Sequence, residues 1–137
     1  MELDDVTGAV VDEAIRIHRD LGPGLLESVY ERLLSSALQR RGLCVECQLG
    51  IDFSHENIEF KDGFRLDLLV ENRVVVEVKS LDRLAPMHTK QLLTYLRVTN
   101  LQVGLLLNFG GGTMKEGIKR IVRDPPPAAS PRLRINQ

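Results

Sequence analysis

Residues 65–80 read RLDLLVENRVVVEVKS, two apolar runs joined by the short polar link ENR at 71–73. Such a pattern predicts a β-hairpin with a tight turn. Asp67 lies in the first run, and Glu77 and Lys79 lie in the second. Because an unpaired charge in a β-rich core costs several kcal/mol, three ionisable groups on neighbouring strands indicate a shared partner such as a cation.

The two faces of the second strand differ in polarity. Side chains alternate along a strand, so Glu77 and Lys79 share one face while Val76 and Val78 share the other. The charged pair is therefore expected on one side of the hairpin. A simple cross-strand ion pair between Asp67 and Lys79 is the alternative interpretation.

Length and composition predict one globular domain. The chain has 137 residues and 43% hydrophobic content, enough to bury a core without disulfides. We expect a single domain over residues 1–123 and a Pro-rich, basic tail over 124–137. Cys44 and Cys47 form a lone Cys-x-x-Cys without nearby histidines in the sequence. We expect structural cysteines, with a redox or metal pair as the alternative.

The net charge of −1 hides an asymmetry along the chain. Residues 115–137 carry six Lys or Arg and two Asp or Glu, a net +4, so the preceding part carries −5. A basic end is suited to contact phosphates, although a solvated tail explains it equally well. The first residues do not resemble a signal peptide, and no window approaches the roughly 18 apolar residues of a membrane span. We expect a soluble cytoplasmic protein without a membrane partner.

Hydrophobic periodicity predicts the order of the secondary structure. Helices are expected over 4–20, from Leu26 to just before Gly42, after Pro86 and over 114–122; strands are expected over 45–53, in the two runs of 65–80 and over 101–109; and 54–63 is expected to be a polar turn with some extended pairing. The strand–helix–strand sequence that ends at 109 favours a parallel pair buried on both faces.

This order, with Asp67 and Glu77-Val78-Lys79 on the hairpin, resembles the PD-(D/E)XK nuclease superfamily. The resemblance implies an α/β fold with a restriction-endonuclease-like core, in which a mixed four-stranded sheet is flanked by helices in the order αα-βββ-α-β. Within the superfamily, residues 24–30, GLLESVY, look like the defining motif of the GxxExxY protein family. The resemblance extends from about Val10 to Phe109. Leu66 stands where the superfamily name has proline, a tolerable change because that proline does no chemistry.

By this resemblance, Asp67 and Glu77 would bind a divalent metal, with the carbonyl of Val78 as a third ligand. Their hard oxygens suit Mg²⁺, or Mn²⁺ in its place. Lys79 would orient or activate the attacking water and stabilise charge on the phosphate. The metal would supply Lewis acidity and help to make the nucleophile.

The resemblance also implies roles for residues outside the hairpin. Glu27 would complete the acidic cluster, although a carboxylate in the first turn of a helix is ordinary. His88, Gln91 and Tyr95 share one helical face, on which Gln91 would face the site and Tyr95 would support it. A core aromatic is the alternative for Tyr95, and a surface histidine is the alternative for His88. Tyr30 would orient Glu27 or pack in the core.

The implied activity is hydrolysis of phosphodiester bonds in DNA, or with less support RNA, by a metal-dependent nuclease. Aromatic residues make up only 4% of the chain and tryptophan is absent, so base-stacking platforms are scarce. We therefore expect little sequence specificity. The alternative is a non-catalytic nucleic-acid-binding or assembly module with a vestigial site. A homodimer or a protein partner is compatible with either function.

Overall fold

The computed structural model describes residues 1–123 and 135–136. The elements in chain order are α1 (Leu3–Leu21), α2 (Glu27–Arg40), β1 (Val45–His55), β2 (Ile58–Val70), β3 (Val74–Lys79), α3 (Pro86–Thr99), β4 (Val103–Asn108), α4 (Met114–Gly117), β5 (Ile118–Val122) and β6 (Ile135–Asn136). The first three predicted helices are confirmed. The tail predicted over 124–137 lies outside the described residues except for β6. No helix in the described part of the chain is long and apolar enough to cross a membrane.

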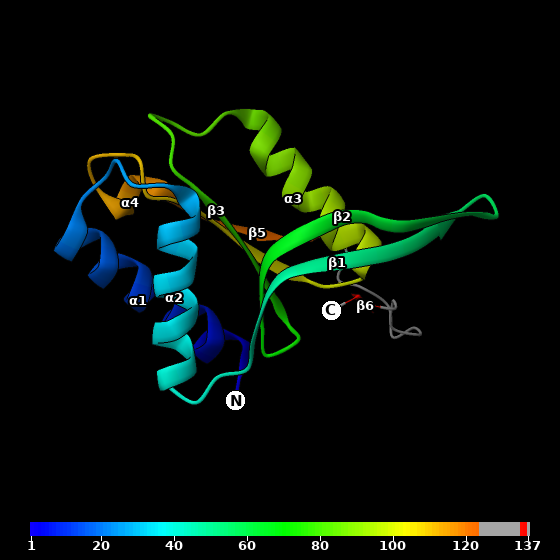
Figure 1. The fold of residues 1–137 in the computed structure, drawn as a ribbon, viewed down its shortest axis with the longest axis horizontal. Helices are drawn as coiled ribbons and strands as arrows, with labels where there is room; N and C mark the ends of the chain where they lie inside the picture. The colour runs from blue at the N-terminus through cyan, green and yellow to red at the C-terminus, as the bar shows by residue number, and fades with distance from the viewer. Residues whose placement is uncertain (124–134, 137) are drawn as a thin grey trace.

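The strands form one mixed sheet in the order β5-β4-β3-β2-β1-β6 (Figure 1). β3 and β4 run parallel, as predicted, and the other neighbouring strands run antiparallel. The prediction of four strands was too low, because among the described residues the sheet has five strands and the two-residue edge strand β6. Both β3 and β4 are almost completely buried, as expected for strands covered on both faces.

Helices cover both faces of the sheet, α1 and α2 on one and α3 on the other (Figure 1). Val10 and Leu34 of the first pair pack in the same buried cluster as Val76. Leu92 and Leu96 of α3 pack with Val75 and its neighbours on the opposite face. The alternation of Val75 and Val76 between two cores follows from the two-residue period of a strand. The charged residues of β3 therefore lie between two apolar layers.

The hairpin of β1 and β2 is longer than predicted. Residues 54–63 were expected to be mainly a polar turn, but the two strands pair as far as His55 and Ile58. Only Glu56 and Asn57 form the turn, with φ values of 52° and 65° that suit a two-residue hairpin loop. The outer part of this hairpin, residues 52–64, extends away from the helices (Figure 1), and we call it the arm. The ring of Phe53 stacks on that of Phe60 and makes a tilted contact with that of Phe64, which favours the extended form over a loop.

The predicted helix over 114–122 was wrong beyond its first turn. α4 ends at Gly117, and β5 follows at once and pairs with β4. A side chain at Gly117 would collide with the carbonyl of Asn108, so only glycine allows the chain to pass so close to β4. The free edge of β4 then supplies hydrogen-bonding partners, which outweigh the weak helical pattern of this short segment.

Candidate active site

The candidate site lies where β2 and β3 separate. The two strands pair from Val70↔Val74 to Leu68↔Val76, and the next residues along them are Asp67 and Glu77. The N–H of Asp67 donates to Oε2 of Glu77 at 2.9 Å, and the N–H of Val78 donates to Oδ2 of Asp67 at 2.8 Å. Each carboxylate therefore accepts a hydrogen bond from a backbone N–H that would have paired with the neighbouring strand if the ladder had continued. The backbone thus fixes both carboxyl groups at the point where β2 and β3 separate, at Asp67 and Glu77, which we call the fork.

Burial and mutual repulsion make this pair electrostatically unfavourable. Glu77 is only 5% exposed, and burial followed by the charge of Asp67 raises the pKa of Glu77 to about 8. Burial also raises the pKa of Asp67, although its hydrogen bonds from Val78 and Gln48 oppose the shift. The positive charge of Lys79 favours the ionised form of both groups. A cation placed between the carboxylates would relieve the remaining repulsion.

Glu27 reaches the site from the first turn of α2. Its Oε2 accepts a hydrogen bond from the N–H of Ser80 at 3.1 Å. The hydroxyl of Ser80 donates in turn to the carbonyl of Leu25 at 2.7 Å. These two bonds join the start of α2 to the residue that follows Lys79. The structure thus brings together four of the residues predicted for the site: Glu27, Asp67, Glu77 and Lys79.

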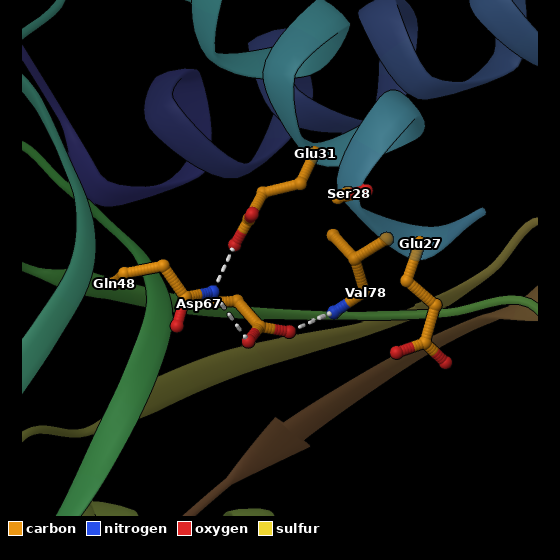
Figure 2. A pocket seen from close by; sticks show the side chains of 6 residues that line it. All are labelled: Glu27, Ser28, Glu31, Gln48, Asp67 and Val78. Atoms are coloured by element: carbon orange, nitrogen blue, oxygen red, sulfur yellow. Dashed lines mark hydrogen bonds between the residues drawn. The ribbon is translucent and has the colours of Figure 1, made fainter.

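A cavity of about 180 Å³ opens between α2 and the strands (Figure 2). It is lined by Glu27, Ser28, Glu31, Gln48, Asp67 and Val78. Glu31 and Gln48 were not predicted from the sequence. Burial raises the pKa of Glu31, and the charges of Asp67 and Glu27 raise it further. Glu31 follows Glu27 by four residues, which places both on one side of the helix, and this spacing was an available signal.

Gln48 links the two carboxylates across the cavity. Its Nε2 donates to Oε1 of Glu31 at 2.6 Å and to Oδ1 of Asp67 at 3.3 Å. The residue has a left-handed φ of 48°, which costs roughly 1–3 kcal/mol for a non-glycine residue. A hydrogen bond of 2.7 Å from Nη1 of Arg65 to the carbonyl of Gln48 helps to offset that cost. The strained backbone turns the amide of Gln48 toward the acidic groups.

Tyr30 holds the loop that precedes Glu27. Its buried ring stacks on Phe109 with a centroid separation of 4.5 Å. Its hydroxyl donates to the carbonyl of Gly22 at 2.6 Å and accepts from the N–H of Leu25 at 3.1 Å. The hydroxyl therefore acts on the loop rather than on the carboxylate of Glu27. Gly24, with a φ of 108°, occupies a conformation within this loop that favours glycine.

The predicted face of α3 converges only in part on the site. The ring of Tyr95 stacks on Phe64 at 4.3 Å, and burial followed by the charges of Glu77 and Asp67 raises its pKa. His88 instead accepts a hydrogen bond at Nδ1 from the N–H of Ala85, at the start of the helix. Gln91 is exposed and does not line the cavity.

A family model of the PD-(D/E)XK nuclease superfamily matches residues 4–121. The chain belongs to this superfamily. The match extends from α1 into β5 and includes Glu27 and the whole hairpin. The superfamily motif appears here as Leu66-Asp67 and Glu77-Val78-Lys79, with Leu66 buried in place of the proline. No curated protein and no solved structure matches the chain.

The donor atoms at the fork of this PD-(D/E)XK domain suit a hard divalent cation. Within residues 1–123 and 135–136, no three His, Cys, Asp or Glu side chains are grouped as a ligand set. Mg²⁺ is commonly held by one or two carboxylates, with water and phosphate oxygens in the other positions. The carboxylates of Asp67 and Glu77, with the carbonyl of Val78, fit that pattern. The two cysteines are free and exposed.

Proposed function

We propose that the protein is a metal-dependent nuclease that hydrolyses phosphodiester bonds, in DNA before RNA and without strong sequence specificity. The observation that carries the proposal is the fork at Asp67 and Glu77, where two adjacent carboxylates are held by backbone N–H groups beside Lys79. A fold without a ligand gains nothing from such an arrangement, since burying two like charges opposes folding. Membership of a nuclease superfamily supports the same activity.

Each residue at the fork has a separate task in this proposal. Asp67, Glu77 and the carbonyl of Val78 would hold Mg²⁺ or Mn²⁺. When bound, the cation supplies Lewis acidity and lowers the pKa of a coordinated water. Lys79 would orient the attacking water and stabilise negative charge on the phosphate. Glu27, fixed by the N–H of Ser80, would complete the acidic cluster.

We also assign the chain to the GxxExxY protein family within the superfamily. The three motif positions have distinct structural tasks that support this assignment. Gly24 supplies the positive φ of the loop, Glu27 lines the cavity, and Tyr30 holds the loop with two hydrogen bonds. The motif therefore describes one structural unit that presents a carboxylate to the fork.

A non-catalytic nucleic-acid-binding module with a vestigial site is the second candidate function. It is favoured by Gln91, which a superfamily nuclease would direct into the site but which is exposed here and does not line the cavity. Nucleic-acid affinity that survives the loss of Asp67, with no turnover in any divalent cation, would support this candidate.

Cleavage of supercoiled plasmid in Mg²⁺ or Mn²⁺ tests the proposed function. We expect the wild type to cut and Asp67→Ala and Lys79→Ala to lose more than about 100-fold in rate, since changes in the outer shell of a metal site alone cost roughly 10–100-fold. Glu59→Ala is the matched control, because Glu59 is an exposed carboxylate of the same strand, outside the site. Calorimetric titration should show cation binding that is lost in Asp67→Ala/Glu77→Ala. Full cleavage by Asp67→Ala would overturn the mechanism.

A further inference from the structure

The segment around α3 carries only positive charge. From residue 83 to residue 115 the chain has no Asp or Glu but contains Arg83, Lys90, Arg97 and Lys115. All 19 acidic residues lie elsewhere in the sequence. The first turn of α3 also lacks the acidic residue that the helix dipole favours at that end. In its charge, the helix therefore differs from the remainder of this nearly neutral protein.

Two of these charges, Lys90 and Arg97, lie on the exposed side of α3. Its outward positions recur at intervals of three or four residues: Met87, Lys90, Thr94 and Arg97. Leu92 and Leu96 occupy the buried side, against the sheet. A rise of about 1.5 Å per residue separates Lys90 and Arg97 by about 10 Å along the axis. The phosphates of one strand repeat every 3.4 Å or so along the axis of a duplex, so two cations about 10 Å apart can contact different phosphates.

Several other exposed arginines, although not Arg32, Arg40 or Arg73, form ion pairs within the described residues. Arg16 and Arg41 bind Glu13, and Arg120 lies 3.2 Å from Asp4. In contrast, none of the described residues forms an ion pair with the side chains of Arg83, Lys90 or Arg97. Cations without such partners release mobile counterions when a polyanion binds.

The α3 segment follows the candidate active site directly in the chain. The loop that follows Lys79 contains Arg83 and leads directly into α3. Tyr95 of the same helix lies close enough to Glu77 and Asp67 for their charges to raise its pKa. The arm, on the other hand, carries four acidic residues and one lysine, so it repels phosphate. A strand bound at the fork is therefore drawn toward α3.

We propose that the stripe formed by Arg83, Lys90 and Arg97, which we call the α3 stripe, is the surface along which the sugar–phosphate backbone of a nucleic acid lies. The identity of the partner rests on the proposed nuclease function. Contacts of this kind carry no base readout, which agrees with activity of low sequence specificity.

Salt-dependent binding to a labelled duplex of about 20 base pairs, measured by fluorescence anisotropy between about 50 and 200 mM salt, tests the stripe. A chelator excludes divalent cations, so that binding is measured without cleavage. Lys90→Ala/Arg97→Ala should lower the slope of log affinity against log salt by about 2, because each lost phosphate contact removes about 0.9. With a single strand of the same length, the double substitution should also lower the slope, but by a smaller amount.

Arg19→Ala/Arg40→Ala is the matched control. It also removes two exposed helix arginines, but from α1 and α2 on the opposite face of the sheet (Figure 1). Its slope should equal that of the wild type, and both double variants should keep the wild-type melting temperature. An unchanged slope in Lys90→Ala/Arg97→Ala, or an equal loss in the control, would overturn the proposal. Equally tight binding of polyglutamate would overturn the assignment to nucleic acid.

The same measurement separates this proposal from the nuclease proposal. A slope change confined to Lys90→Ala/Arg97→Ala supports the α3 stripe even if no cation produces cleavage. Conversely, suppose that cleavage depends on Asp67 but the salt slope does not change in Lys90→Ala/Arg97→Ala. That result would support the nuclease proposal and overturn the proposal of the α3 stripe.

Discussion

Gln48 combines backbone strain with hydrogen bonds to two carboxylates of the cavity. Its left-handed φ of 48° places its amide between Glu31 and Asp67. We predict that Gln48→Gly is more stable than Gln48→Ala by about 1 kcal/mol, because only glycine adopts this φ without steric cost while both variants lose the same hydrogen bonds. Urea denaturation of the two variants measures the difference.

The control for this prediction is the pair Ser54→Gly and Ser54→Ala, at an exposed position of the same strand. Gly50 of that strand is buried, so a substitution there would not isolate the backbone effect. Ser54 has no positive φ, and there alanine should be the more stable of the two. If glycine and alanine at position 48 unfold at the same urea concentration, the left-handed conformation stores no strain.

The sequence revealed some site residues and not others for a physical reason. Asp67, Glu77 and Lys79 are charged residues inside apolar runs, and that contrast is visible without any knowledge of the fold. Gln48 faces Asp67 only because β1 pairs with β2 in one particular register, through Cys47↔Leu68 and Leu49↔Leu66. Register depends on long-range pairing, so the amide of Gln48 was not predictable from local pattern.

At the scale of elements, Glu13 ties α1 to the end of α2. Its carboxylate accepts hydrogen bonds from Arg41 at 2.7 Å and from Arg16 at 2.9 Å. Burial raises the pKa of Glu13, but these two arginines outweigh it and the pKa lies below 4.5. We predict that Glu13→Gln lowers the free energy of unfolding at neutral pH by about 0.5–1 kcal/mol, a small value because Arg41 is 41% exposed.

The pH dependence of this effect follows from the lowered pKa. A carboxyl group that ionises more readily when folded stabilises the protein above its unfolded pKa, and this contribution disappears as the pH falls through the folded value. The stability difference between wild type and Glu13→Gln should therefore shrink below about pH 4. Denaturation curves from neutral to acidic pH measure it, with Glu116→Gln as an exposed control. A difference that grows on acidification would show that the arginines do not lower this pKa.

The predictability of each element depends on its length and partners. The three long helices have apolar residues at helical spacing, and this signal survives in the folded chain. The pairing of the arm was underestimated because most of its outer residues are polar and exposed, and stacking of Phe53 on Phe60 supports it instead of core burial. β5 was missed because a short segment takes its conformation from the free edge of β4 rather than from its own pattern.

At the scale of the whole molecule, the fold concentrates its least favourable electrostatics at the fork. Two apolar cores sandwich β3 and exclude water from Glu77, while the separation of β2 from β3 beyond Leu68 leaves room for the cavity beside Asp67. The same geometry that suits a cation therefore weakens the protein that lacks one. Under the proposed function, stability and activity are opposed at this point, as is common for active sites.

Replacing Glu77 by glutamine tests this opposition. In a chelating buffer we predict that the free energy of unfolding of Glu77→Gln exceeds that of the wild type by at least about 1 kcal/mol. The buried glutamine carries no charge, whereas the buried glutamate must either stay charged or take up a proton. In Mg²⁺ or Mn²⁺ this difference in stability should shrink or change sign. A cation at about 100 times its dissociation constant adds roughly 2.7 kcal/mol to the free energy of unfolding of a protein that binds the ion only when folded. Thermal and urea denaturation with and without the cation, with Glu59→Gln as the exposed control, measure both parts. A less stable Glu77→Gln in chelator, with no cation effect on the wild type, would mean that Glu77 is a structural residue and not a metal ligand.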